Sequence, residues 1–112
     1  MQGNNALLVE GLPAAGTLAQ YQPVQLSGAA ATAGGNAIGF TNVAAVAGDR
    51  VPVTVIGTSL AVAGAAITAG ALVEVHTTVT QVVTKSSGVP IGRALSAASA
   101  AGDIIEVLLI PN

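Results

Sequence analysis

The sequence predicts an all-β fold, a small single-domain β-barrel or β-sandwich of short strands with an extended N-terminal arm. Several stretches alternate apolar and polar residues with a period of two, which is typical of strands. Glycine-rich turn signals separate these stretches at intervals of roughly 8 to 12 residues. No stretch keeps a period of 3.6 over three helical turns. At 112 residues the chain has the length of one domain.

The first 19 residues differ from the rest, and we expect residues 1–19 to form an arm ahead of a domain that spans 20–112. A polar start, MQGNN, is followed by one short apolar patch and then by small residues. The patch consists of Ala6, Leu7, Leu8 and Val9. This patch can add as a strand to the sheet edge of a neighbouring molecule. A first strand of the domain itself, or a frayed terminus, is the alternative.

Two later stretches are nearly identical in pattern, AGDRVPVTVI at 47–56 and AGDIIEVLLI at 101–110, and AGALVEV at 69–75 is a weaker copy. In each, a small residue and a glycine precede an alternating strand. Glycine supplies the backbone angles of a tight turn, and an aspartate side chain can bond to the backbone two residues on. The expected inward positions are Val51, Val53, Val55, Val73, Val75, Ile105, Val107 and Leu109.

Shorter strand signals fill the remaining chain. The expected strands are Gln20–Leu26, Ala37–Ala44, Thr78–Thr84 paired with Leu72–Thr77 as a hairpin, and Pro90–Leu95. Pro23 marks the first of these as an edge strand, because proline has no N–H for a ladder. The sequence predicts a loop for Gly28–Gly35, and a loop or a single helical turn for Ser96–Ala101.

The composition argues for a buried rather than a free surface. Charged residues make up 7% of the chain, against roughly 25% in an ordinary soluble domain. Lysine and glutamate usually populate free surface and are depleted at interfaces. We therefore expect a subunit that covers much of its surface with neighbours.

The charges also exclude several partners. The net charge is −2 and only three cations are present, so the chain lacks the basic stripe of a nucleic-acid-binding protein. There is no cysteine for a disulfide or a thiolate metal site. Residues 51–73 carry no charge but contain proline and glycines and have no aromatic or basic anchors, so we expect no membrane span. The N-terminus has no basic region before an apolar run, as a secretory signal would.

Candidate catalytic residues are few. His76 is the only histidine, and a histidine metal site usually needs further His or Cys ligands. Asp103 and Glu106 are three apart, which in a strand places them on opposite faces. The stretch GLPAAGT at 11–17 has the glycine spacing of a phosphate loop without its lysine. We expect no enzyme activity, no catalytic residue, no metal and no cofactor.

The order of motifs from residue 20 onward resembles the head decoration, or capsid cement, proteins of tailed bacteriophages. The steps are the Gly-Asp turn with its valine strand at Gly48–Gly57, ITAGALVEV at Ile67–Val75, IGRAL at Ile91–Leu95, and AGDIIEVLL at Ala101–Leu109. Each step alone is weakly specific, and their order together is more so. The arm lies outside the resemblance.

The resemblance implies a β-barrel or β-sandwich protein without enzymatic activity. It implies a position on the outer surface of the capsid of a virion, after synthesis in the host cytoplasm. There the protein would bridge major capsid proteins and stabilise the expanded head. It also implies a homo-oligomer, with a trimer favoured over a dimer, and neither nucleic acid nor membrane as a partner.

The alternative function is a small binding module, such as a glycan-binding, fibre or surface domain. Sugar-binding faces usually present aromatic platforms, and this chain offers only Tyr21 and Phe40.

The apolar positions that the fold leaves over are candidates for capsid or subunit contact. In the last strand Ile104, Leu108 and Ile110 face away from the inward residues. Together with Ala6–Val9 they form the expected contact set.

Overall fold

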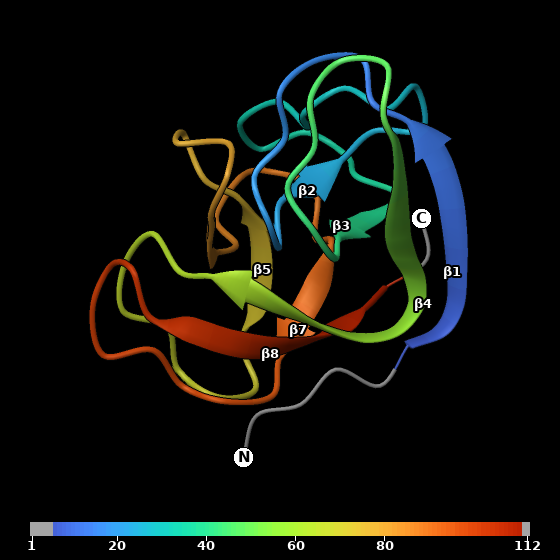
Figure 1. Cartoon of the computed structure of the whole chain (residues 1–112). Coiled ribbons are helices and arrows are strands. Elements are labelled where there is room, and N and C mark those ends of the chain that lie inside the picture. The colour runs from blue at the N-terminus through green and yellow to red at the C-terminus, as the bar shows by residue number, and fades with distance from the viewer. Residues whose placement is uncertain (1–5, 111–112) are drawn as a thin grey trace.

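The computed structural model describes the backbone of residues 6–110 and the side chains of residues 11–110. Eight antiparallel strands form a nearly closed barrel, and the described chain contains no helix (Figure 1). The strands are β1 (Ala6–Pro13), β2 (Pro23–Val24), β3 (Gly39–Thr41), β4 (Arg50–Val62), β5 (Leu72–Val75), β6 (Val82–Thr84), β7 (Gly92–Ala94) and β8 (Ile104–Leu109). The predicted all-β class is confirmed.

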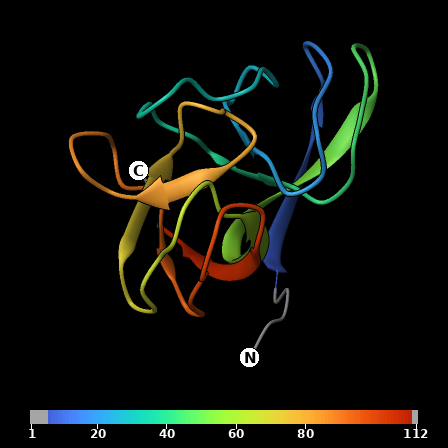
Figure 2. The same ribbon diagram turned by 90° about the vertical axis from the view of Figure 1, so that its left-hand side faces the viewer.

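Strand β4 belongs to two parts of the sheet. Its first half pairs with β1 and β3, and its second half, from Thr58 to Val62, pairs with β8. Gly57 lies at the change of partner with a φ of +107°. Beyond it the strand order β4-β8-β7-β5-β6 curls into a barrel, which a parallel bridge between Ala63 and Val82 closes. In Figure 2 the ribbon of β1 and β4 rises at the right, beside the barrel.

The three repeated phrases form three similar turns, which we call the glycine turns (residues 46–49, 68–71 and 100–103). Their central residues Gly48, Gly70 and Gly102 have φ between +91° and +93°. Each glycine N–H donates to the carbonyl of an alanine in a segment distant along the chain, namely Ala14 (2.9 Å), Ala94 (2.7 Å) and Ala63 (2.7 Å) respectively. Strands β4, β5 and β8 start directly after these turns. The prediction that the repeated phrase leads into a strand is confirmed.

The aspartates in two of these turns bond in the direction opposite to the expected one. The Asp49 carboxylate accepts from the N–H of Val46, and the Asp103 carboxylate accepts from the N–H groups of Ser99 and Ala100. The residues after each aspartate are already extended in a strand, so the free amides of the turn lie before it. The expectation of a bond two residues onward is therefore wrong.

Two buried clusters lie on the inner faces of the strands. The larger one, the barrel core, contains Phe40 and the inward residues of β5 and β8. The smaller one, the ribbon core, contains Leu18, Val51 and Val53, with Val55 packed against it. All the inward positions predicted for the three repeated phrases belong to one of these clusters.

The shorter elements match the prediction in type more closely than in length. Strand β2 has two residues and β3 has three, whereas β4 runs for 13. β5 and β6 form the expected antiparallel hairpin, and β2, which begins with Pro23, stands at the end of the strand order. Residues 96–101 form turns and bends without a helical turn.

The stretch expected to be an arm is ordered in part as strand β1. From Ala6 to Pro13 it pairs antiparallel with β4 of the same chain, with Ala6 opposite Gly57 and Pro13 opposite Arg50. This arrangement is the alternative stated above, a first strand of the domain itself. Residues 1–5 lie outside the described residues, and an exchange of this segment between molecules stays a prediction.

Candidate functional site

The described residues contain no cluster of catalytic type. No three His, Cys, Asp or Glu side chains between residues 11 and 110 lie close enough together to hold a metal ion. No helix in the described chain is long and apolar enough to span a membrane. Within the described residues, the candidate sites are therefore surfaces.

The Glu74 carboxylate on β5 bonds to the backbone of the loop that follows β6. Its Oε1 accepts from the N–H of Ser86 at 2.6 Å and from the N–H of Gly88 at 3.1 Å. Chiefly because of the Ser86 amide, and then the Gly88 amide, the pKa of this carboxyl lies below its ordinary value. Gly34 packs against the same carboxylate, where its Cβ position would lie 3.5 Å from Oε2.

His76 follows β5 directly, and its side chain bonds to a backbone amide two residues away. Its Nδ1 accepts from the N–H of Thr78 at 3.0 Å, and its ring lies against Gly64, where a Cβ would be 2.7 Å from Cγ. The side chains of His76 and Glu74 each accept a hydrogen bond from the backbone of a loop.

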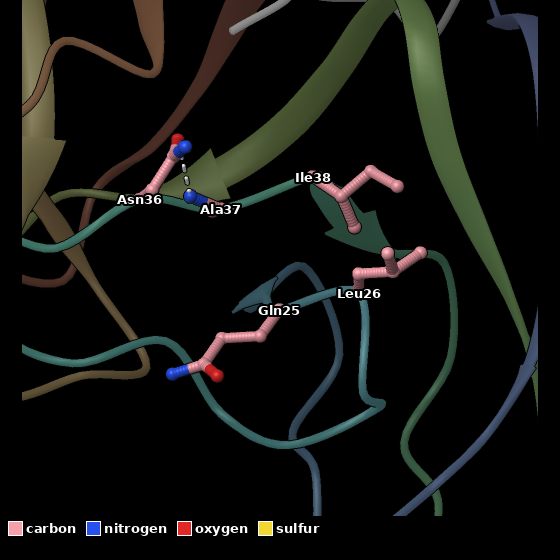
Figure 3. A pocket seen from close by; sticks show the side chains of 5 residues that line it. All are labelled: Gln25, Leu26, Asn36, Ala37 and Ile38. Carbon is pink, nitrogen blue, oxygen red and sulfur yellow. Dashed lines mark hydrogen bonds between the residues drawn. The ribbon is translucent and has the colours of Figure 1, made fainter.

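A shallow hollow opens beside the ends of β2 and β3 (Figure 3). Leu26 and Ile38 form its apolar side, and the amide groups of Gln25 and Asn36 stand at its rim. The Asn36 Oδ1 accepts from the N–H of Ala37 at 2.9 Å. Leu26 is 70% exposed.

A group of exposed and half-buried apolar side chains lies on the outer face of the barrel, over β4, β8 and the end of β7. We call it the outer sheet patch and define it as Leu60, Leu95, Ile104 and Leu108, which surround Glu106. Leu95, Ile104 and Leu108 are 42 to 44% exposed, and Leu60 is half-buried. The register joins them, because Leu60 pairs with Glu106 and the Leu95 N–H donates to the Glu106 carbonyl at 2.8 Å.

Glu106 lies in the middle of this patch and is covered by it. Its strand neighbours Ile105 and Val107 point into the barrel core, so the Glu106 side chain points outward. Only 3% of the residue is exposed. Its backbone N–H donates to Ser96 Oγ at 3.0 Å.

The structure separates the predicted contact residues into three places. Ile104 and Leu108 belong to the outer sheet patch. Ile110 lies just beyond β8, is half-buried, and donates its N–H to the Ile91 carbonyl at 3.3 Å. Ala6–Val9 lie in β1, where their backbone pairs with β4; their side chains are outside the described ones.

Sequence reasoning missed Leu95 and the burial of Glu106. A signal for Leu95 exists, because Ala94 is an inward residue of a short strand and the next side chain must point out. Leu60 on β4 and Leu95 just after β7 lie beside Glu106 through the strand register, which no local pattern of the sequence reports.

The comparisons with known proteins agree with this absence of catalytic clusters. A family model described as phage cement protein matches residues 4–109 of the chain. Among solved structures, the crystal structure of the head fiber gp8.5 N base in bacteriophage phi29 is similar in fold. It has a TM-score of 0.72 and 14% identity over 92% of this chain and 93% of that chain. No curated protein sequence gives a significant match.

Proposed function

Since the chain belongs to the phage cement protein family, a structural and non-enzymatic family, we propose that it binds the outer surface of an expanded phage head. There it stabilises the shell by bridging major capsid proteins. The observation that carries this proposal is the family match, which spans residues 4–109 and so includes almost the whole described fold. The similarity to the phi29 structure supports the fold alone, because the identity is only 14%.

The surface has the properties that such a bridge requires. Charges are sparse, and the apolar side chains of the outer sheet patch stay partly exposed in the single chain. Large exposed apolar faces on a small protein mark interaction sites. A subunit that touches two shell proteins gains from effective concentration, so each single contact can be weak.

Strand β1 offers a second contact of a different kind. In the described chain it pairs only with β4, and it stands at the outer side of the molecule in Figure 1. The other edge of β1 is therefore open to strand addition. We propose that the segment Ala6–Val9 contacts a capsid protein or a neighbouring subunit through this edge.

We further propose that the protein acts as a homo-oligomer, a trimer rather than a dimer. A two-fold contact through the outer sheet patch would place Glu106 close to its own copy. Two carboxylates at one axis repel each other, whereas a three-fold ring brings different surfaces together.

The test is binding of the purified protein to expanded heads from which decoration has been removed. We expect saturable co-sedimentation at a fixed ratio to the major capsid protein, and heads that withstand more heating before they rupture. Absence of binding to heads of its own phage would contradict the proposal.

A substitution links this function to the outer sheet patch. Leu108→Glu places a charge in the apolar face and is expected to weaken head binding or oligomer assembly. Val43→Glu is the control, because Val43 is similarly exposed, at 47%, but lies outside the patch. Equal binding by both variants would remove the patch from the contact.

A further inference from the structure

We propose that the guanidinium group of Arg93 binds a carboxylate of the major capsid protein, an aspartate or glutamate side chain set in an apolar surface. The contact forms when the outer sheet patch lies against the shell. This inference rests on the proposed function and gives the chemistry of one of its contacts. It is supported by the position of Arg93 beside the patch, by the anchoring of its side chain, and by its free hydrogen-bond donors.

Arg93 is an exposed cation among apolar side chains of the outer barrel face. It lies on β7 between Gly92 and Ala94, which are both buried, so the Arg93 side chain points outward. In the strand register it lies opposite Leu108 on β8 and opposite Leu72 on β5. Leu108 is 42% exposed, and Leu72 is half-buried. A partner that covers these two leucines therefore also meets the guanidinium group.

The Arg93 side chain is anchored to the glycine turn at 68–71. Its Nη1 donates to the Gly70 carbonyl at 2.7 Å. The turn itself is tied to β7, because the Gly70 N–H donates to the Ala94 carbonyl at 2.7 Å and the Ala94 N–H donates to the Ala71 carbonyl at 2.8 Å. A side chain that is held before binding loses less conformational entropy when the partner arrives.

Most donors of the Arg93 guanidinium group stay available to a partner. Within the described residues, its side chain bonds only to Gly70, and no carboxylate lies within ion-pair distance of it. A guanidinium group carries five N–H donors in a planar fork that matches the two oxygens of a carboxylate. Glu106 belongs to the same face but is only 3% exposed, so this face presents a cation rather than an anion.

The carboxylates of a second copy are poorly suited to this contact. Asp49 and Asp103 accept hydrogen bonds from amides of their own turns. Glu74 and Glu106 are buried in the chain that carries them. All four carboxylates among the described side chains are thus bonded or covered. The capsid protein is therefore the favoured source, and a charge pair that its apolar surface encloses contributes more than one at an exposed rim.

The test compares the affinity of two arginine variants for undecorated expanded heads. Arg93→Gln removes the charge, and we expect it to bind about tenfold or more weakly than the wild type. Arg50→Gln is the matched control, because Arg50 is also exposed and also donates its Nη1 to a glycine carbonyl, that of Gly11 at 2.6 Å. Arg50 lies at the start of β4, outside the patch, and the affinity of this variant should stay within about twofold of the wild type.

The dependence on salt concentration separates a lost charge from a changed shape. The head affinity of the wild type and of Arg50→Gln should fall as the salt concentration rises. That of Arg93→Gln should fall less, because salt no longer screens this charge pair. Urea unfolding verifies that both variants fold, and sedimentation equilibrium gives their oligomeric state.

The outcomes distinguish this inference from the proposed function. Wild-type affinity in Arg93→Gln, in a protein that does bind heads, overturns the inference and leaves the proposed function intact. Equal losses in Arg93→Gln and Arg50→Gln also overturn it, because the position of the arginine would then not matter. A changed oligomeric state of Arg93→Gln overturns it as well, because the carboxylate would then belong to a second copy. Failure of the wild type to bind any head overturns both.

Discussion

At the scale of single residues, the glycine turns depend on a backbone conformation rather than on space. Gly102 has a φ of +93°, and a Cβ built there would meet no atom within 4 Å. We expect Gly102→Ala to lower the free energy of unfolding by about 1 to 2 kcal/mol, because an L-residue is strained at this φ. Urea unfolding followed by circular dichroism measures the change.

Gly16→Ala is the control for that prediction. Its Cβ would also meet nothing within 4 Å, but its φ lies outside the left-handed region. This variant should be as stable as the wild type or slightly more so. Equal losses in both variants would show that the turn conformation does not set the cost.

Glu74 predicts a pH dependence of stability. Its folded pKa lies below the ordinary value of 4.5, so its contribution to stability is present above that pH and is lost as the pH falls through the folded pKa. Below about pH 4.5 the wild type should therefore lose stability faster than Glu74→Gln, which cannot titrate. Urea unfolding between pH 6.5 and pH 3 checks this, and parallel curves for the two proteins would contradict it.

The sequence predicted the orientation of single side chains where that orientation depends only on the alternation within one strand. Alternation identified the inward valines, because a strand fixes the face of each side chain whatever its partners are. It misjudged Asp49 and Asp103, since the direction of an aspartate bond depends on which nearby amides are left free. The roles of Glu74 and Glu106 depend on loops and strands far along the chain, which alternation does not report.

At the scale of elements, β4 couples the two buried clusters. It supplies Val51 and Val53 to the ribbon core and Ala61 to the barrel core. Phe40, from β3, lies in the barrel core although its strand pairs beside the ribbon. The two parts should therefore unfold together in one transition.

Phe40→Ala tests this coupling. We expect a loss of about 3 to 5 kcal/mol in the free energy of unfolding, because the side chain is fully buried. Tyr21, whose N–H donates to the Thr41 carbonyl, reports on the β2–β3 region by fluorescence, and circular dichroism reports on all strands. Coincident midpoints are expected from the two signals, and separate midpoints would show that the clusters unfold independently.

Element lengths were harder to predict than element types. Strands β2 and β3 are short because their pairing stops where the neighbouring chain turns away, and that point depends on the fold. β4 runs on past Gly57 because a different strand takes over as its partner there. Gly57, with its positive φ, lies within this longer strand.

At the scale of the whole molecule, the family and the all-β class followed from the sequence, whereas the contact surface followed only in part. Ile104 and Leu108 were identified as outward residues, and their companions Leu60 and Leu95 come from β4 and the end of β7. The strand order places these four side chains around one carboxylate. No spacing within a single phrase of the sequence reports that arrangement.

The proposed trimer leads to a prediction for the free protein. Sedimentation equilibrium of the purified chain should give three times its mass of 10.7 kDa at high concentration. A dimer would contradict the three-fold arrangement and would favour binding at the two-fold positions of the shell.

Because β1 pairs with β4, the first strand is synthesised before the strand with which it pairs. Ala6 lies opposite Gly57, so the first strand leaves the ribosome well before its partner exists. At roughly 5 to 20 residues per second, the delay is on the order of 3 to 10 seconds. During that interval an apolar segment that reads ALLVE has no strand beside it. Every new copy of this protein thus passes through a brief period in which mispairing with another nascent chain competes with its own completion.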